Sequence, residues 1–280
     1  MKFGIFLAPF HRVGEDPTLC FARDMQLIEW LDELGYEEAF IGEHHSSGWE
    51  IISSPEIFMA VAATRTRRIM LGSGVVSVPY HHPFHIANRF ALLDHLTRGR
   101  VMLGCGPGAL AADAHMLGID TTTQRRRMVE GVQAIVRLFT ERGGITLDGS
   151  YFKLNDAHLQ VKPFQQPHMP IFVASTISPS GMVAAGQLGR GVLSVASYAQ
   201  GGLDDLMKRW AMAKRPRPRM ARPWIGAIGD WFFPFISPNH ATKHCATSMT
   251  APIAGFRIIS STRSARGCSS RSTRTSRSKR

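Results

Sequence analysis

Cysteine is scarce in this sequence, and long apolar runs are absent. The four cysteines, Cys20, Cys105, Cys245 and Cys268, have no paired spacing, which argues against a zinc knuckle or a disulfide framework. No apolar run approaches the about 18 residues that a membrane helix needs. Residues 1–12 resemble a first strand more than a signal peptide. We therefore expect a globular protein of the reducing cytoplasm that holds no metal.

Acidic residues are almost absent from the last quarter of the chain. Residues 1–213 contain 19 Lys and Arg against 20 Asp and Glu, whereas residues 214–280 contain 14 basic residues against Asp230 alone. The whole net charge of +12 therefore belongs to the last quarter. Arg, Ser, Thr and Pro dominate there, and apart from an aromatic island at 224–236 such composition does not order itself.

This basic tail has three interpretations. Out-of-frame translation of GC-rich coding sequence yields such a composition, and we favour it. The alternatives are a nucleic-acid-binding arm, because basic tails bind phosphate backbones without needing a fold, and an unusual native tail.

Strand and helix patterns alternate along residues 1–213. The sequence predicts six strands, at 2–9, 38–44, 69–78, 100–104, 170–174 and 191–195. It predicts helices at 19–34, 55–66, 83–97, 121–140, 179–187 and 202–213, and a hairpin at 145–154 around Asp148-Gly149.

This alternation implies right-handed βαβ units around a parallel sheet, the α/β class. The first strand is followed by no dinucleotide fingerprint, so we favour a TIM (β/α)8-type barrel over a doubly wound sheet. A barrel needs eight strands to close and only six are predicted. We therefore expect an incomplete barrel of about six βα units in residues 1–213 and a separate basic tail in residues 214–280.

The stretch from 40 to 49 is the strongest candidate for chemistry, because an apolar run there ends in Glu43, His44 and His45. In parallel α/β folds the carboxyl ends of strands are where active sites collect. Successive strand residues face opposite sides, so if His44 faces inward, Glu43 and His45 face away. One histidine would then act as general base, general acid or hydrogen-bond donor. A pair of structural histidines at a strand end is the open alternative.

A metal site is a further alternative at this place. Adjacent histidines diverge on a strand, and the sequence has no known ligand spacing, so we disfavour it. It would combine His44 or His45 with His81, His82 and His85.

Two loops offer binding groups for a cofactor. Ser175, Thr176, Ser178 and Ser180 lie after the fifth strand and ahead of a helix, where hydroxyls and backbone amides can hold a phosphate; helix capping is the alternative. The loop at 104–108 lacks Gly-x-Gly-x-x-Gly spacing, but its glycines allow the backbone to approach a ligand ring closely.

Aromatic residues could line an apolar pocket, or they could simply pack in the core. They are Phe6, Phe10, Trp49 and Phe58.

Several segments taken together resemble one family, the bacterial luciferase-like flavin-dependent monooxygenases, in particular its limonene 1,2-monooxygenase-like members. The resemblance runs in order from residue 1 to about residue 213 and then stops. Its segments are 41–45, 52–56, 67–76, 82–83, 93–101, 104–108 and 173–180.

The resemblance implies a reduced flavin cofactor, FMN or FAD, and assigns residues to it. His44 occupies the position of the catalytic histidine beside the flavin ring. Among Arg125, Arg126 and Arg127 we assign the phosphate-binding role to Arg125, and solvated helical positions to the other two. The remaining cofactor-binding candidates are Glu43, Gly104, Gly106, Ala174, Ser175, Thr176 and Ser178.

The same resemblance implies insertion of one oxygen atom from O2 into a small apolar, terpene-like molecule. A separate reductase would deliver the flavin, no membrane or nucleic-acid partner is expected, and a homo-oligomer stays open. The first alternative is a deazaflavin-dependent oxidoreductase of the same superfamily, which moves a hydride. The second is an inactive barrel fragment with a nucleic-acid-binding tail. An open barrel exposes two sheet edges, so we also expect weak flavin binding and poor solubility.

Overall fold

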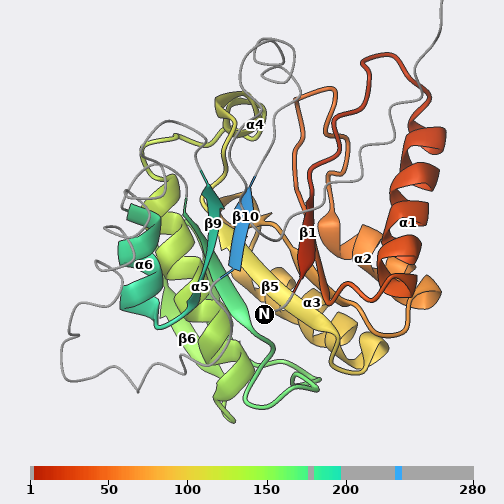
Figure 1. Ribbon diagram of the computed structural model, residues 1–280. Coiled ribbons are helices and arrows are strands. Elements are labelled where there is room, and N and C mark those ends of the chain that lie inside the picture. Colours follow the sequence, from red (N-terminus) through yellow and green to blue (C-terminus); the bar gives the residue numbers. More distant parts are fainter. Residues whose placement is uncertain (1–2, 176–179, 197–230, 235–280) are drawn as a thin grey trace, which may run out of the picture. The chain divides into compact units, whose positions relative to one another are not determined.

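A sheet of parallel strands forms the centre of the fold (Figure 1). The computed structural model describes residues 3–175, 180–196 and 231–234. The strands follow the order β1-β2-β3-β5-β8-β9-β10, each parallel to its neighbours, and β4 pairs beside β5. They are β1 (Gly4–Leu7), β2 (Glu38–Ile41), β3 (Met70–Ser73), β4 (Val76–Ser77), β5 (Val101–Gly106), β8 (Ile171–Ser175), β9 (Gly191–Ala196) and β10 (Trp231–Pro234).

Helices connect these strands, as βα units require. A separate antiparallel hairpin, β6 (Ile145–Asp148) with β7 (Lys153–Ala157), stands outside the parallel sheet. The helices are α1 (Pro17–Glu33), α2 (Pro55–Arg65), α3 (Pro83–Thr97), α4 (Ala111–Met116), α5 (Gln124–Thr140) and α6 (Ser180–Leu188), with a short 3-10 helix η1 (Val78–Tyr80).

The helices begin where the sequence provides caps. The Asp16 carboxylate accepts hydrogen bonds from the backbone N–H groups of Thr18 and Leu19, and Pro17 follows it at the first helical position. His82 Nδ1 accepts from the backbone N–H of Phe84 at the start of α3. Ser54 precedes α2 but makes no capping hydrogen bond with its side chain.

The six predicted strands and the hairpin are confirmed, but some predicted boundaries are wrong. The second strand ends at Ile41 rather than His44, because the backbone N–H of His44 donates to Ile52 O instead of continuing the ladder. The third is divided by Gly74 and Val75 into β3 and β4.

Two helices also differ from expectation. The long helix begins at Gln124 rather than residue 121, because Asp120 binds Thr122 and Thr123 in a local turn. Helix α4 was not predicted, since six residues are too few for a periodic pattern. The helix predicted at 202–213 lies outside the described residues. Strand β10 falls within the aromatic island of the basic segment.

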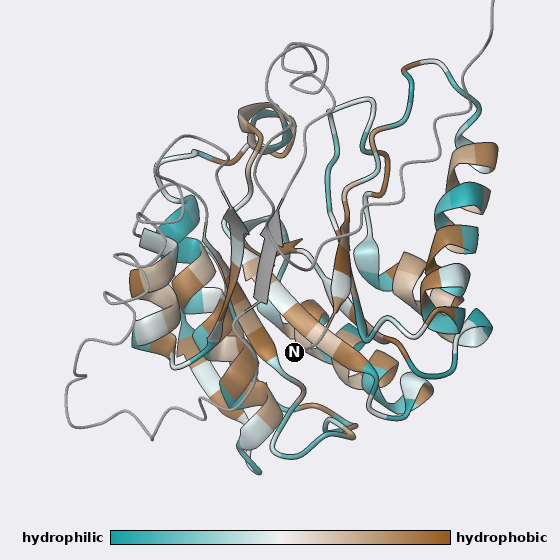
Figure 2. Ribbon diagram, in the orientation of Figure 1, coloured by the Kyte–Doolittle hydropathy of each residue, from teal (hydrophilic) through white to brown (hydrophobic). Residues whose placement is uncertain are grey.

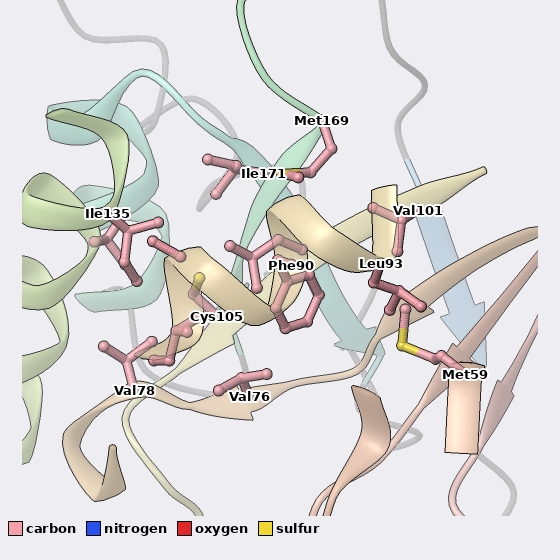
Figure 3. Close-up of a cluster of buried hydrophobic side chains, with 14 of the residues drawn as sticks. Met59, Val76, Val78, Phe90, Leu93, Val101, Cys105, Ile135, Met169 and Ile171 are labelled. Carbon is pink, nitrogen blue, oxygen red and sulfur yellow. The ribbon is translucent and has the colours of Figure 1, made fainter. Parts of the chain in front are cut away.

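Both faces of the sheet are apolar. One face packs against the helices in a large cluster, where side chains from α2, α3, β5, α5 and β8 converge (Figure 3). The other face carries a smaller cluster, one residue from each of four strands, with alternate residues of each strand dividing between the two. Its members are Phe40, Met102, Phe172 and Leu193. Figure 2 shows this apolar character along the strands, and helices that alternate between apolar and polar residues.

Helix α5 shows how the sequence covers the sheet. Its buried residues Met128, Val132, Ile135, Leu138 and Phe139 recur at three- and four-residue steps and form one apolar stripe. Arg125, Arg126 and Gln133 are exposed on its other side, and the helix packs against α3 and α6.

Buried polar side chains join consecutive βα units. The Asp32 carboxylate at the end of α1 accepts from the backbone N–H groups of Arg67, Arg68 and Ile69 at 2.9, 2.8 and 2.7 Å. Arg100, just before β5, donates to the carbonyl oxygens of Ala63, Thr66 and Ile69 at 3.0, 3.2 and 3.1 Å. Several residues in segments 67–76 and 93–101, which carry the family resemblance, therefore have a structural role.

Within the described part of the chain, every helix is too short or too polar to cross a membrane.

Candidate functional site

The candidate site is built from loops that follow strands β2, β4, β5 and β8. Because these strands are parallel, their carboxyl ends lie at one edge of the sheet (Figure 1). The loops carry the acid, histidine, glycine and serine residues that the sequence singled out.

Glu43 is a buried carboxylate that joins three segments. Its Oε1 lies 3.0 Å from Nε2 of both His45 and His81, and its Oε2 accepts from the backbone N–H of Ser77 at 2.9 Å. Burial would raise the pKa of Glu43, but these hydrogen bonds and the His81 charge lower it below its usual value. Glu43 is therefore an anion that ties the end of β2 to the segment after β4.

His44 lies between two other carboxylates. Its Nε2 is 2.9 Å from Glu50 Oε2, and its Nδ1 is 3.6 Å from Asp113 Oδ2. The second distance is too long for a hydrogen bond, so Nδ1 is buried without a hydrogen-bond partner. Burial would lower the pKa of His44, but the hydrogen bond and charge of Glu50 and the charge of Asp113 raise it. The imidazolium form is thereby favoured.

Asp113 holds the loop that carries the histidines. It is 1% exposed on α4, and its Oδ1 accepts from the hydroxyl of Ser46 and from the backbone N–H of His45 at 3.3 Å. Asp113 and Glu50 were both missed by sequence reasoning. Glu50 has no spacing pattern with His44 that reveals their contact, and Asp113 lies on the short helix that the sequence did not predict.

The expected divergence of His44 and His45 is observed, although the strand ends before them. His44 faces Glu50 and Asp113, whereas His45 joins Glu43 and contacts the Tyr80 ring edge-on at 6.0 Å between centroids. The hydrogen bond to Glu43 raises the pKa of His45.

The histidines considered for a metal have other partners. His81 binds Glu43, His82 caps α3, and His85 packs against the rings of His82 and Phe84. Among the described residues, one group of three has ligand atoms that all lie within 4.8 Å of one another: His11, Glu15 and Cys20.

That second cluster already has its own partners. Arg23 donates to the Glu15 carboxylate and to Cys20 Sγ, and His11 Nε2 lies 2.9 Å from Asp24 Oδ2. A guanidinium among the ligand atoms repels a cation, so the cluster is an ion-paired network.

The glycines at the end of strand β5 allow close backbone packing, and the structure places Gly104 and Gly106 in the strand itself rather than in the loop expected at 104–108. Ser73 Oγ bonds both the carbonyl and the N–H of Gly104, at 2.9 and 3.0 Å, and a Cβ at Gly104 would overlap the Ser73 carbonyl oxygen. At Gly106 it would overlap the Val75 side chain. These glycines are thus required for packing against the segment between β3 and β4. Their approach to a flavin ring stays a prediction.

The predicted phosphate residues are partly brought together. The Arg125 guanidinium at the start of α5 is exposed and donates to the Ser180 hydroxyl at the start of α6. Ser175 ends β8 after the partly buried Ala174, and its hydroxyl is buried without a hydrogen-bond partner. Thr176 and Ser178 lie outside the described residues.

The two neighbouring arginines turn to other partners. Arg126 Nε is 3.9 Å from Glu130 Oε1, and Arg127 lies over the Tyr151 ring at 5.4 Å. Of the three arginines, Arg125 is the one that contacts Ser180, at the end of the predicted phosphate-binding segment 175–180.

The four aromatic candidates divide between core and surface. Phe58 belongs to the main core cluster, and Phe6 packs against the smaller one. Phe10 and Trp49 are both 42% exposed. They lie in loops that are joined by a backbone hydrogen bond from the N–H of His11 to the carbonyl oxygen of Trp49.

The fold and the site together define a parallel βα protein of the barrel class with carboxylate–histidine pairs after the strand ends. The family model of the luciferase-like monooxygenases matches residues 1–228. This chain therefore belongs to the luciferase-like monooxygenase family. The family and the barrel fold expected from the sequence segments are confirmed.

Individual relatives are similar over the same region. The 4-hydroxyprotoasukamycin monooxygenase of Streptomyces nodosus subsp. asukaensis is 51% identical over 76% of this chain and 58% of its own length. Limonene 1,2-monooxygenase of Rhodococcus erythropolis is 48% identical over 76% and 54%. The 5,10-methylenetetrahydromethanopterin reductase of Archaeoglobus fulgidus is 30% identical over 71% and 54%. The chain thus spans a little over half the length of these curated relatives.

Solved structures give the same picture. A monooxygenase from Streptomyces bottropensis matches with a TM-score of 0.71 and 30% identity, over 76% of this chain and 64% of that one. The oxygenating constituent of 3,6-diketocamphane monooxygenase from Pseudomonas putida, in complex with FMN, matches with a TM-score of 0.67 and 26% identity, over 76% and 61%.

Proposed function

We propose that this chain is the oxygenating component of a flavin-dependent monooxygenase that uses reduced FMN and O2. One observation carries the proposal: contacts run from His45 through Tyr80 and Gln124 to the first turn of α5, whose Arg125 binds Ser180. The loops after four strands are thereby joined into one site.

The residues present fit a flavin phosphate. The buried Ser175 hydroxyl has spare hydrogen-bonding capacity, and the exposed Arg125 guanidinium provides the charge that a phosphate prefers. We assign phosphate binding to Arg125, Ser175, Thr176 and Ser178, and ring contact to Gly104, Gly106 and Ala174.

His44 supplies the proton-bearing group. Bound reduced flavin supplies two electrons to O2, so that one oxygen atom enters the substrate and the other leaves as water. Glu50 and Asp113 raise the pKa of His44 and so favour its protonated form, which can donate a hydrogen bond or a proton to a reacting oxygen. Because Nε2 contacts Glu50, it can donate to a reacting oxygen only after this contact with the Glu50 carboxylate breaks.

We further propose a small apolar, terpene-like substrate and a separate flavin reductase. A relative at 48% identity is named limonene 1,2-monooxygenase, and a structural neighbour is described as an oxygenating constituent. The apolar inner face of the sheet is consistent with an apolar substrate.

Isotopically labelled O2 tests the proposal. Purified full-length chain, chemically reduced FMN and limonene are mixed, and products are analysed by mass spectrometry. We expect labelled oxygen in the product only with protein present, because free reduced flavin also consumes oxygen. Absence of labelled product, with flavin shown to be bound, would refute the monooxygenase assignment.

A deazaflavin-dependent oxidoreductase is the second candidate, since one relative, 30% identical to this chain, is named as a reductase and not as a monooxygenase. Such an enzyme transfers a hydride and needs no O2. Anaerobic oxidation of a reduced deazaflavin by an organic acceptor, in the presence of the chain, would support it over the monooxygenase.

A further inference from the structure

The Tyr80 hydroxyl lies where three segments of the candidate site meet. Tyr80 ends η1, and its hydroxyl accepts a hydrogen bond of 3.0 Å from Nε2 of Gln124, the first residue of α5. Gly108 has φ +91°, and a Cβ there would overlap the Tyr80 hydroxyl. The loop after β5 therefore packs directly on the Tyr80–Gln124 pair.

This pair fixes the end of the helix that carries Arg125. Gln124 is 7% exposed, whereas the next residue, Arg125, is exposed and donates to the Ser180 hydroxyl. Adjacent residues of a helix move together, so anchoring Gln124 sets where the Arg125 side chain starts. Placement within about 0.5 Å is what a charged binding group requires.

Tyr80 is suited to this anchoring. Burial raises the pKa of its hydroxyl, so the group stays neutral, and its oxygen accepts the hydrogen bond from Gln124. Its ring also contacts the His45 ring edge-on, with 6.0 Å between centroids, which adds a second contact that holds Tyr80 in place.

We propose that Tyr80 and Gln124 are positioning residues that give the site its preference for a phosphorylated flavin, because they hold Arg125 in place opposite Ser180. The inference rests on the proposed flavin site. It assigns a role to two residues that touch neither His44 nor the phosphate-binding serines.

The ratio of FMN to riboflavin affinity tests this role, since riboflavin lacks the phosphate. Dissociation constants are measured by flavin fluorescence quenching for the full-length chain and for Tyr80→Phe and Gln124→Leu. We expect each substitution to weaken FMN binding about tenfold, part of what a hydrogen bond to a charged group contributes. Riboflavin binding should stay within about twofold.

The matched control is Tyr151→Phe. The Tyr151 hydroxyl is buried without a hydrogen-bond partner, so its removal should leave both affinities unchanged. In an Arg125→Ala background, Tyr80→Phe should no longer affect FMN, because the group that it positions is gone.

Two results would overturn the inference alone: equal loss of FMN and riboflavin affinity in Tyr80→Phe, or an undiminished effect in the Arg125→Ala background. If the unsubstituted chain binds FMN no tighter than riboflavin, the proposed phosphate site itself is wrong, and the inference falls with it.

Discussion

His44 Nε2 lies 2.9 Å from Glu50 Oε2, in a loop where five residues separate them. The Glu50 side chain is 12% exposed, so the pair is largely shielded from water. A second carboxylate, Asp113, faces the other ring nitrogen. The imidazole is thereby fixed in orientation and favoured in its protonated form.

Glu50→Gln should lower the pKa of His44. In the unsubstituted chain we expect a pKa above the usual value of about 6.5, measured by NMR titration of the ring protons. A raised folded-state pKa means that His44 stabilises the fold below about pH 6.5 and loses this contribution as pH rises through the folded value. Glu29→Gln, at an exposed pair with Arg65, should leave His44 unchanged. An unaltered His44 pKa in Glu50→Gln would contradict the assigned pairing.

His44→Ala and Arg125→Ala should affect different properties. Loss of His44 should reduce product formation about 100-fold or more, with FMN affinity almost unchanged. Loss of Arg125 should weaken FMN binding about tenfold. The control is Arg126→Ala, since Arg126 faces Glu130 instead. Equal loss of both properties in both variants would show that the roles are wrongly divided.

Gly104→Ala should destabilise the fold by about 1–3 kcal/mol, because the added methyl overlaps a backbone oxygen of Ser73 that cannot rotate away. Nothing lies within 4 Å of a Cβ at Gly143, so Gly143→Ala should change stability by less than about 0.5 kcal/mol. Urea unfolding of the two variants measures the difference. Similar stabilities would mean that strands β3 and β5 pack less tightly at Gly104 than the structure shows.

Asp32→Asn should destabilise the fold at neutral pH and matter less in acid. Burial would raise the pKa of Asp32, but hydrogen bonds from Arg67, Ile69 and Arg68 lower it. A lowered folded-state pKa stabilises the fold above the unfolded value of about 3.9, and this contribution is lost as pH falls through the folded value. Thermal unfolding should therefore separate the two proteins at pH 7 and bring them together in acid. A constant difference across pH would exclude the charge as the cause.

Resequencing across the codons for residues 211–215 should reveal a second frame that encodes two further βα units. The reason is that a barrel of this family needs eight strands, while residues 214–280 carry a net charge of +13 with Asp230 as their one acid. If a single frame is confirmed, the arm interpretation is tested by DNA binding at low salt, with a chain truncated after residue 213 as control.

The sheet and its helices follow from local signals. Apolar runs mark β2, β5 and β8, helical spacing of apolar residues marks α1, and proline after Ser54 marks α2, so the sequence predicts these elements within a few residues. Contacts between distant side chains leave no such pattern. Asp113 reaches the histidine loop across 67 residues to Ser46, and α4 is too short to show a helical period.

The site shows the same division. Glu43, His44 and the serine loop stand out as polar groups at the end of apolar strands, which is a physical signal in the chain itself. Glu50 contacts His44, and Tyr80 contacts Gln124, but neither contact leaves a pattern in the sequence. The basic composition of residues 214–280 is compatible with several interpretations, and it does not by itself choose between them.

The ties made by Asp32 and Arg100 span single βα units, since each joins groups 31 to 37 residues apart. These two side chains thus join neighbouring units along the sheet. In repeat proteins, where contacts run between neighbours, folding propagates from unit to unit, so we expect the first units here to form before the later ones. Unfolding should begin at the outer strands and reach β3 and β5 last, an order that hydrogen exchange would record.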